Sequence, residues 1–570
     1  MESNCCITNK NYKCKNSATK SLNMVFASLC ILLLQAALIE PVSADSKFIY
    51  TPLEVQYTWQ RFPALPTQDS FNTFTTDLNG DGATDLVITG GTFPGDHEGS
   101  RGPQPGLILF NNGDNTFSPA DGDVAGSENA SNILVEDYNN DGILDIYITD
   151  NGYDGPPFPG FNDQLLLGTG LGFTDVSERL PDIAAFTHGG ASGDIDGDGD
   201  VDVISLNTNS EADKLSYFLI NDGDANFTMD RQRLPESLNS TDQEILKQSF
   251  SAALADLSGN GFADLIIGRE IDGRTRIHWN DGAGFFSDID VTYLDEVDVW
   301  GVGEENIAVV KIKAVDINGD NRLDLLLTPV DQGTFVGVGM QLYINYGGRE
   351  FKDETVARLS NAVRDPSYQG SYLTQFTDVN GDGIIDILPL NPQSSADTTL
   401  LFEGDGEGCF TRISMDEVSN DQDLRYRLSL HPVISPAGIG YVEVTGDFGT
   451  DEDVIQINSY APIDIQPNAP IANLFNTCRG KLETNIEVDG ESLYFLEFTI
   501  FSSTPDIVIQ ADAASAQELT ESMENLASFS SAEGELVLPE LVVDGEVAVR
   551  NLVFKLMDAG QLLFRLDSFE

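Results

Sequence analysis

Short apolar segments follow acidic loops at regular intervals along most of the chain. Leu86-Val-Ile88 comes after the first of these loops, and Ile387-Leu388 comes after the sixth. Apolar runs bounded by Asp, Asn and Gly are typical of β-strands. The loops recur about every sixty residues, a spacing that indicates a repeat architecture. They begin at Asp77, Asp137, Asp194, Asp256, Asp316 and Asp378.

A second element follows each acidic loop. It consists of an apolar strand, a turn that contains Gly, and an aromatic residue, which together predict a β-hairpin. Each unit therefore has a strand into the loop, a strand out of it and a hairpin, which makes four strands. The aromatic residues are Phe117, Phe173, Phe227, Phe285, Phe351 and Phe410, and a weaker seventh copy ends at Gly480.

Four-stranded units of this kind predict a closed ring. A single such sheet cannot bury its faces, whereas seven sheets in a circle each pack on two neighbours and leave no open edge. We therefore expect an all-β fold, a seven-bladed β-propeller over residues 45–480. A linear solenoid is the alternative, but solenoids with acidic repeats have periods of about nine residues. The strand-like stretch 48–62 either completes the last blade or caps the first.

The sequence changes character after about residue 481. Val488-Asp-Gly-Glu491 recurs as Val543-Asp-Gly-Glu546, and an alternating apolar strand follows each copy. We interpret residues 481–570 as a small duplicated β-rich C-terminal domain. Leu519, Met523 and Leu526 have helical spacing and indicate one connecting helix. The pattern does not assign a role, so a stabilising or surface-attachment module is the default interpretation.

The first 44 residues resemble an export signal. Lysines between Lys10 and Lys20 precede an apolar run over residues 24–39, and small residues at 42–44 offer a cleavage site. This arrangement predicts a secretory signal peptide over residues 1–44, and an uncleaved membrane anchor is the alternative. We expect a secreted, periplasmic or cell-surface protein with no membrane insertion after cleavage. Cys409 and Cys478 remain in the mature chain and can pair, although their spacing does not establish a disulfide.

The acidic loops have the oxygen ligands that a hard divalent cation requires. Carboxylate or amide oxygens stand at loop positions 1, 3, 5 and 9, Gly stands at position 6, and position 7 lends a backbone carbonyl. We therefore expect up to six structural Ca²⁺ ions. The shorter acidic segment 446–453 is expected to keep its strand and to lack the metal. The candidate ligands are Asp77, Asn79, Asp81, Ala83 and Asp85; Asp137, Asn139, Asp141, Ile143 and Asp145; Asp194, Asp196, Asp198, Asp200 and Asp202; Asp256, Ser258, Asn260, Phe262 and Asp264; Asp316, Asn318, Asp320, Arg322 and Asp324; and Asp378, Asn380, Asp382, Ile384 and Asp386.

The loops are not expected to be equivalent. The third has four carboxylate ligands with Asp200 beside them, so we expect it to bind most tightly. The fourth has Ser258 and Asn260 in place of acidic ligands and should bind more weakly. The fifth has Asn321 where the others have Gly, and Asn tolerates the left-handed backbone that this position needs.

Charge narrows the set of partners. The chain has 92 acidic and 30 basic residues and a net charge of −62. A protein of this kind is repelled by nucleic acid and by anionic lipid, and we expect a soluble monomer. The acidity itself indicates no specific acidic partner.

Taken in order, these motifs resemble the FG-GAP/VCBS repeats of exported proteins and, more distantly, the propeller of integrin α subunits. The resemblance rests on Phe-x-x-x-Asp-x-Asn-Gly-Asp-Gly-x-x-Asp-Leu followed by Asn-x-Gly-x-x-x-Phe, and it covers residues 48–480. It implies a seven-bladed propeller with calcium between the first two strands of several blades. It also implies a role in adhesion, carbohydrate binding or protein interaction.

The sequence contains few residues or motifs that are typical of an enzyme active site. The four histidines are His97, His188, His278 and His431, and no nucleophile elbow, phosphate loop or zinc cluster is present in the sequence. We assign no catalytic residue and no further cofactor. The leading hypothesis is a secreted calcium-binding module for an extracellular glycan or protein. A polysaccharide lyase on the same scaffold is the alternative, so enzymatic activity stays open.

The best candidates for a ligand-binding surface are the inserted loops and the exposed aromatic side chains. Gly-rich inserts at 90–105, 150–161 and 333–339 interrupt the repeat, and loops on a rigid scaffold often carry binding. Either a packing role or a binding role is open for four further residues. They are His188, which precedes two glycines, and the tryptophans Trp59, Trp279 and Trp300.

Overall fold

The computed structural model describes much of the chain between residues 57 and 569. The signal-peptide prediction (1–44), most of the sixth acidic loop (378–383) and Cys478 lie outside the described residues. The described ranges are 57–63, 71–90, 104–122, 126–153, 158–208, 211, 214–241, 249–269, 274–294, 307–331, 336–338, 340–359, 374–377, 384–389, 399–406, 408–414, 430–436, 438–447, 454–460, 473–476, 481–490, 492–503, 506–512, 516–518, 526–543, 546–559 and 562–569.

The chain divides into two compact units. One unit is Tyr50–Pro467, and the other includes Asn468–Glu570. Both consist of antiparallel sheets, with only short helical turns among the described residues at Ser177–Arg179, Glu236–Asn239 and Thr355–Arg358. The prediction of an all-β chain is therefore confirmed.

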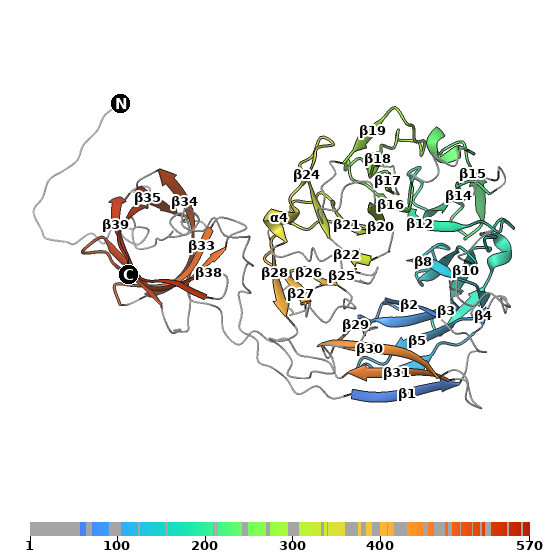
Figure 1. Cartoon of the computed structure of the whole chain (residues 1–570), viewed down its shortest axis with the longest axis horizontal. Helices are drawn as coiled ribbons and strands as arrows, with labels where there is room; N and C mark the ends of the chain where they lie inside the picture. Colours follow the sequence, from blue (N-terminus) through green and yellow to red (C-terminus); the bar gives the residue numbers. More distant parts are fainter. Residues whose placement is uncertain are drawn as a thin grey trace, which may run out of the picture. The chain divides into compact units, whose positions relative to one another are not determined.

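The larger unit contains consecutive antiparallel sheets, each built from neighbouring segments of the chain (Figure 1). In each of the first six sheets the first and second strands flank an acidic loop, as the sequence predicts. The first three sheets are β2 (Phe71–Thr76), β3 (Asp85–Gly90), β5 (Leu107–Asn111) and β6 (Phe117–Pro119); β8 (Ala130–Glu136), β9 (Asp145–Asp150), β10 (Gln164–Gly168) and β11 (Phe173–Asp175); and β12 (Thr187–Gly193), β13 (Asp202–Asn207), β14 (Tyr217–Asn221) and β15 (Phe227–Asp230).

Four further sheets follow, and the last takes a strand from the N-terminal part. β22 (Val336–Val338) is an extra strand beside β21, and β4 (Gln104–Pro105) pairs separately with β7 (Gly126–Ser127). The sheets are β16 (Ser251–Ala255), β17 (Asp264–Gly268), β18 (Arg276–His278) and β19 (Val291–Tyr293); β20 (Ile307–Val315), β21 (Asp324–Asp331), β23 (Gln341–Asn345) and β24 (Phe351–Asp353); β25 (Thr374–Thr377), β26 (Asp386–Pro389), β27 (Thr399–Gly404) and β28 (Phe410–Ser414); and β29 (Leu430–Ser435), β30 (Gly438–Asp447), β31 (Val454–Tyr460) and β1 (Tyr57–Pro63).

The N-terminal strand β1 joins the last sheet. It lies antiparallel to β31, with Tyr57 opposite Tyr460 and Pro63 opposite Val454. Of the two roles left open by the sequence, β1 therefore completes the last sheet. Hydrogen bonds between Gln60 and the main chain of Phe117 also connect β1 to the first sheet.

Hydrophobic cores lie between consecutive sheets. Leu86 and Ile88 of the first sheet pack with Val442 and Ile457 of the last one. Similar clusters join the first sheet to the second, and so on to the sixth. Figure 1 shows the sheets around a common centre, with the first strands β8, β12, β16 and β20 on the inner side. The first five sheets thus each pack on both neighbours among the described residues, as the repeat requires.

The last sheet differs from the sequence prediction. Its first two strands, β29 and β30, are joined by a short turn between Ser435 and Gly438. The acidic segment 446–453 instead lies between the second and third strands, β30 and β31, and residues 448–453 are outside the described part. The prediction aligned this segment with the wrong pair of strands, because acidity was taken as the marker of the first connection.

The C-terminal unit is a closed barrel. Pairing runs through β33 (Lys481–Val488), β37 (Ala527–Ser530), β38 (Glu535–Val543), β39 (Glu546–Asp558), β40 (Leu563–Ser568), β35 (Asp506–Ala511) and β34 (Ser492–Ser503), and then returns to β33. The short strands β32 (Asn473–Asn476) and β36 (Gln517–Glu518) attach to it. Leu482, Phe498, Leu538, Phe554 and Phe564 are among the buried residues that fill its core.

Barrel closure was not foreseen, but the duplication has a structural counterpart. The two Val-Asp-Gly-Glu copies lie at the β33–β34 and β38–β39 turns, and the third strands of the two copies, β35 and β40, pair with each other. The weak seventh hairpin copy contributes β32, which pairs with β33 and β38 of this unit. The predicted helix lies mostly outside the described residues, since 519–525 are not described.

The structure also describes the hairpin aromatic residues and one of the two cysteines of the predicted mature chain. Five of the six hairpin aromatics begin the strand that follows the turn, whereas Phe285 is 43% exposed and Phe286 is buried in its place. Cys409 is disulfide-bonded.

Candidate metal-binding loops

The acidic loops share one backbone arrangement that follows from their residue types. In the first loop, Asp77 accepts hydrogen bonds from the backbone N–H groups of Gly80 and Gly82, at 2.8 and 2.9 Å. Gly82 has a φ of 83°, which L-residues other than Gly and Asn rarely adopt. The loop therefore wraps around the carboxylate at position 1, as cation-binding loops do.

The same contacts recur in the other described loops. In each of them, the carboxylate at position 1 accepts a hydrogen bond from the backbone N–H of position 6. The pairs are Asp137 with Gly142, Asp194 with Gly199, Asp256 with Gly261 and Asp316 with Asn321. Asn321 has a φ of 64°, so the expectation that Asn supports this turn is confirmed. Position 5 accepts from the N–H of position 7 in the described loops, as Asp81 does from Ala83.

The aspartate at position 9 is buried and anchors the loop to its sheet. In the first loop, one Asp85 oxygen accepts from the N–H of Leu78 and the other from the N–H of Asn111, both at 2.8 Å. The other copies, Asp145, Asp202, Asp264 and Asp324, make equivalent pairs of bonds. Asp386 of the sixth loop accepts from Gly404, the equivalent hairpin residue.

Burial raises the pKa of these carboxyl groups well above 3.8. Desolvation is the largest cause, the two backbone hydrogen bonds oppose it, and neighbouring acidic side chains of the same loop add to it. The pKa rises to about 7 for Asp85 and Asp202 and to about 6 for Asp145, Asp264 and Asp324. A cation at the loop would offset both the burial and the repulsion.

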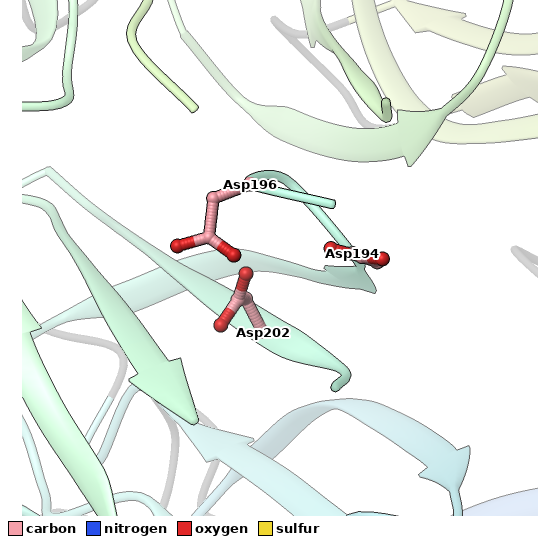
Figure 2. Close-up of side chains that lie close together, drawn as sticks. All are labelled: Asp194, Asp196 and Asp202. Carbon is pink, nitrogen blue, oxygen red and sulfur yellow. The ribbon is translucent and has the colours of Figure 1, made fainter. Parts of the chain in front are cut away.

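The third loop brings its carboxylates closest together. One ligand oxygen from each of Asp194, Asp196 and Asp202 lies within 4.8 Å of the other two, so this acidic cluster can hold a metal ion. Figure 2 shows the carboxylates of Asp196 and Asp202 directed toward each other. Oδ1 of Asp196 is buried and has no hydrogen-bond partner. An oxygen of this kind fits a cation, because it otherwise bears the full cost of desolvation.

Two neighbouring side chains that the sequence did not single out shape this loop. Arg233 lies 3.1 Å from Oδ2 of Asp196 and leaves Oδ1 facing the cluster. Arg233 also donates to the carbonyl of Ala283 in the next sheet. Asp200, expected beside the ligands, instead accepts a 2.8 Å hydrogen bond from Asn140 of the second loop. Its carboxylate therefore connects two loops.

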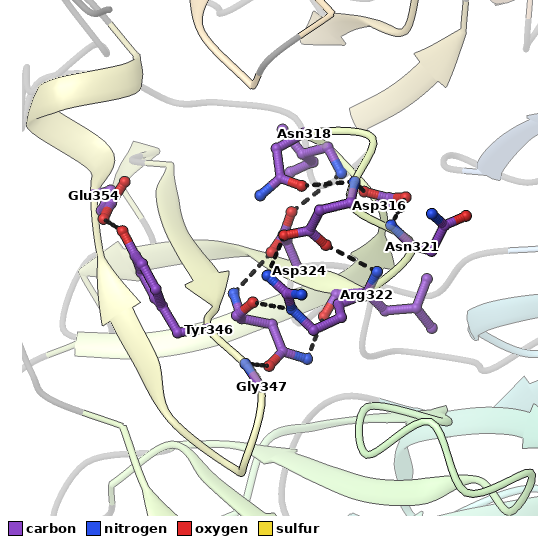
Figure 3. Close-up of polar contacts among 12 residues, drawn as sticks. Asp316, Asn318, Asn321, Arg322, Asp324, Tyr346, Gly347 and Glu354 are labelled. Atoms are coloured by element: carbon purple, nitrogen blue, oxygen red, sulfur yellow. Dashed lines mark hydrogen bonds and ion pairs between the residues drawn. The ribbon is translucent and has the colours of Figure 1, made fainter. Parts of the chain in front are cut away.

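The fifth loop differs because an arginine side chain already forms an ion pair with one of its carboxylates. Arg322, at position 7, forms an ion pair with Asp320 at position 5, and its Nε donates to the carbonyl of Asn345 at 2.7 Å. Figure 3 shows this guanidinium among the polar groups of the loop. A metal ion would have to compete with Arg322, which the sequence-based ranking did not consider.

The fourth and sixth loops complete the comparison with the predicted ligands. In the fourth, Ser258 and Asn260 replace acidic groups, and the Ser258 hydroxyl donates to Asp256 at 3.4 Å. In the sixth, Asp378, Asn380 and Asp382 lie outside the described residues, while Ile384 and Asp386 lie within them. The structure thus positions the predicted residues of five loops around common turns, and it groups three carboxylates tightly only in the third loop among those described.

A hairpin asparagine connects the third, fourth and fifth loops each to the preceding loop. The side-chain amide of Asn280 donates to Ala263 of its own loop and to Ile195 of the third loop. Asn221 and Asn345 repeat this pattern, reaching Tyr138 and Leu257 respectively. The recurring Asn-x-Gly motif was visible in the sequence, but its partner lies about eighty residues away and could not be read from spacing.

Comparison with known families agrees with this repeat. The FG-GAP-like repeat matches residues 77–148, 194–267, 256–327 and 316–389, and each match begins at position 1 of an acidic loop. The chain is an FG-GAP-like repeat protein. Within it, every matched segment spans two successive acidic loops and the strands between them.

One curated relative of this FG-GAP-like repeat protein is a T-cell immunomodulatory protein homolog from Plasmodium yoelii yoelii. The two are 26% identical over 223 residues, which is 36% of this chain and 30% of that protein. The chain therefore aligns with less than a third of the relative's length.

Two solved structures show loose similarity to the repeat protein. An Agrocybe aegerita lectin that recognises non-reducing terminal N-acetylglucosamine has a TM-score of 0.39 and 18% identity, over 66% of this chain and 85% of the lectin. The rhamnogalacturonan lyase PL11 of Bacillus licheniformis has a TM-score of 0.27 and 12% identity, over 92% and 90% of the two chains. Similarity at this level carries no argument about function.

A helix that crosses a bilayer needs a long apolar segment. Among the described residues, no helix has the length and apolar character needed to cross a bilayer.

Proposed function

We propose that this chain is an exported, calcium-stabilised seven-bladed β-propeller that binds carbohydrate or protein. The seven-bladed interpretation is supported by the consecutive sheets, by the hydrophobic clusters between neighbours and by β1, which completes the sheet formed by β29, β30 and β31. A ring closed in this way leaves a rigid scaffold with loops on both ends.

Calcium is the metal that suits the loops best. Their donors are carboxylate, amide and carbonyl oxygens, and a hard cation with flexible coordination prefers such ligands. Asp194, Asp196 and Asp202 would hold the ion in the third loop, and the ligands at positions 1, 3, 5 and 9 would do so elsewhere. The ion would supply positive charge between buried and exposed carboxylates. Its role would be structural, because the ligands join the first and second strands of a blade.

Export is consistent with this requirement. The predicted leader over residues 1–44 would deliver the protein to a calcium-rich compartment, where loops of modest affinity can fill. We therefore place the mature protein outside the cytoplasm, in a secreted or surface-associated form.

A row of aromatic rings carries the proposal of a binding role. Phe158, Phe186, His188 and Phe250 follow one another with centroid distances of 5.1, 5.0 and 4.5 Å. Phe158 comes from the insert at 150–161 and is 41% exposed, whereas Phe186 is buried. Planar rings that reach the surface from a rigid scaffold are suited to stacking against a ligand.

A glycan and matrix-protein array tests this proposal. The calcium-loaded protein should bind selected glycans or proteins, and removal of the metal should abolish that binding because the ring loosens. Chain scission of a retained polysaccharide would instead favour the lyase. No retention on any ligand of either class, with a folded and calcium-loaded protein, would contradict the binding role.

A further inference from the structure

Two lysines lie on one face of β20, the first strand of the fifth sheet. Lys311 and Lys313 are separated by one residue, so their side chains leave the strand on the same side. Nζ of Lys311 donates to Oδ1 of Asn132 on β8, the first strand of the second sheet. The third and fourth sheets lie between these two along the chain. First strands of sheets that are not neighbours can meet only across the centre, so Lys311 lies at the centre of the ring.

These lysines differ from the others in the described part of the chain. Each of the other four forms an ion pair with a glutamate: Lys214 with Glu211, Lys352 with Glu350, Lys481 with Glu497, and Lys555 with Glu535. For Lys311 and Lys313, no ion pair with a carboxylate is found among the described residues. This absence occurs in a protein with 92 acidic and 30 basic residues.

The surroundings of the two lysines explain why an anion would be favourable. Burial, and then the charge of Lys313, lower the pKa of Lys311 to about 8, and burial also lowers the pKa of Lys313. Glu136 stands on the same face of β8 as Asn132, but burial raises its pKa, and among the described residues it forms no ion pair with either lysine. Lys311 is half-buried and Lys313 is exposed, so an anion from solvent can reach the pair and offset the repulsion between the two cations.

The aromatic row ends next to these lysines. Phe250 packs against Ala308 and Val310 of β20, directly before Lys311. At the other strand, the side-chain amide of Asn132 donates to the carbonyl of His188, the ring that contacts Phe250. The lysines, the amide and the rings therefore form one series of contacts, which is exposed at Phe158 and at Lys313.

We propose that Lys311 and Lys313 bind the carboxylate of an acidic sugar, a uronate, whose neighbouring sugar ring stacks on this aromatic row. This inference rests on the proposed binding function and specifies its ligand class. A carboxylate would neutralise the lysine pair, and the flat apolar face of a sugar would match an exposed ring. An acidic peptide offers the same carboxylate but lacks those faces.

The net charge of the protein does not prevent this binding. At about 0.15 M ionic strength the screening length is roughly 8 Å, so distant surface carboxylates act weakly on a ligand at the centre. Bound calcium would lower the repulsion further.

Isothermal titration with three small probes tests the inference. The calcium-loaded full chain would be titrated with trigalacturonate, with the same trisaccharide after reduction of its carboxyl groups, and with triglutamate. We expect trigalacturonate to bind at least tenfold more tightly than either of the other probes. The Lys311→Met/Lys313→Met variant should lose at least tenfold in affinity for trigalacturonate, and Lys352→Met, which removes an exposed paired lysine, should bind like the wild type.

The variants should fold, because the substitutions remove two neighbouring like charges, neither of which forms an ion pair among the described residues. The melting temperature of each variant in calcium checks this. Lys313→Met alone provides a second test, since the Lys313 side chain forms no hydrogen bond with the described residues.

Several outcomes separate this inference from the proposed function. Equal binding of the reduced trisaccharide, or wild-type affinity in the lysine variant, would overturn the uronate site while leaving glycan binding intact. Lysine-dependent binding of triglutamate in preference to the sugar would replace the glycan with an acidic peptide. Failure of the wild type on every glycan and protein of the array would remove the proposed function as well.

Discussion

The side-chain amide of Asn280 donates to the main-chain carbonyl of Ile195 at 2.7 Å, although the two residues belong to the fourth and third sheets. The same amide donates to Ala263 at 2.9 Å. One buried side chain thus links two successive acidic loops. Because Asn221 and Asn345 repeat the arrangement, these amides form a series of connections between successive sheets.

Replacement of Asn280 by Ala should destabilise the larger unit. Two carbonyls would lose their donor in a buried position, at a cost of about 1–3 kcal/mol. Urea unfolding of the calcium-loaded protein would measure this loss. Asn226→Ala, which removes an exposed hairpin asparagine, should change the stability by much less. Equal effects of the two changes would show that the Asn280 connection is not important for stability.

Asp202→Asn should remove one bound calcium ion. The substitution keeps the size of a buried side chain that accepts from Ile195 and Asn221, but it removes the negative charge at position 9 of the third loop. Equilibrium dialysis followed by elemental analysis should give one ion fewer per chain. Asp222→Asn alters an exposed hairpin carboxylate and should leave the number of ions unchanged. An unaltered calcium content in Asp202→Asn would contradict a metal site in this loop.

Arg322→Ala should strengthen calcium binding at the fifth loop. The change removes a positive charge and frees the carboxylate of Asp320, and both effects favour the ion by roughly tenfold. Calorimetric titration should show that one site has become tighter. Arg349→Ala, which breaks the ion pair with Asp290 outside the loops, serves as the control. If Arg322→Ala weakens binding, the guanidinium orders the loop and does not compete with the metal.

Metal-stripped protein should lose stability as pH rises from 5 to 7.5. The buried aspartates at position 9 have a folded pKa of about 6–7, above the ordinary 3.8, so between about pH 4 and 7 the folded state retains protons that the unfolded state has released. Stability is then highest at low pH and declines as pH passes through the folded pKa, by roughly 5 kcal/mol in total after screening.

Calcium should reverse this dependence because it binds the ionised carboxylates. The melting temperature, recorded from pH 5 to 8 with dialysed protein and with added calcium, should show the largest calcium effect at pH 7.5. A calcium effect that is constant across this range would mean that the buried aspartates are not ligands. The rising negative charge of the whole protein acts in the same direction in the metal-free form.

Phe158→Ala should weaken ligand binding without affecting the fold. The ring is 41% exposed and contacts Phe186 at a centroid distance of 5.1 Å, so its removal shortens the aromatic row. We expect about a tenfold loss in affinity for any ligand identified on the array. Phe285→Ala is a matched control, since Phe285 is 43% exposed and lies in a different hairpin. Parallel losses in both variants would argue against a specific role for the row.

The loops were predictable from sequence because their contacts are local. Asp77 accepts from residues three and five positions later, and Asp85 accepts from Leu78, so a fixed spacing of Asp and Gly reports this geometry directly. The hairpins were predictable for the same reason. Phe285 is the exception, because its neighbour Phe286 takes the buried position beside Phe218.

The features that escaped prediction depend on distant partners. The Asp200 carboxylate turns to Asn140 in another loop, and Asn280 reaches Ile195 in another sheet. The last sheet was misaligned because its first connection, near Ser435, contains no acidic pattern. The barrel depends on the parallel pairing of β33 with β37, and parallel pairing has no local signature in the sequence.

The pairing of Tyr57 with Tyr460 has a consequence for how the molecule is made. A chain synthesised from its N-terminus delivers the edge strand β1 before the three strands that complete its sheet. β1 therefore has no strand to pair with until the intervening sheets and β31 have been synthesised, so the last sheet is completed late. A fragment that stops before residue 454 would keep all the acidic loops and yet leave its first strand without a place to dock.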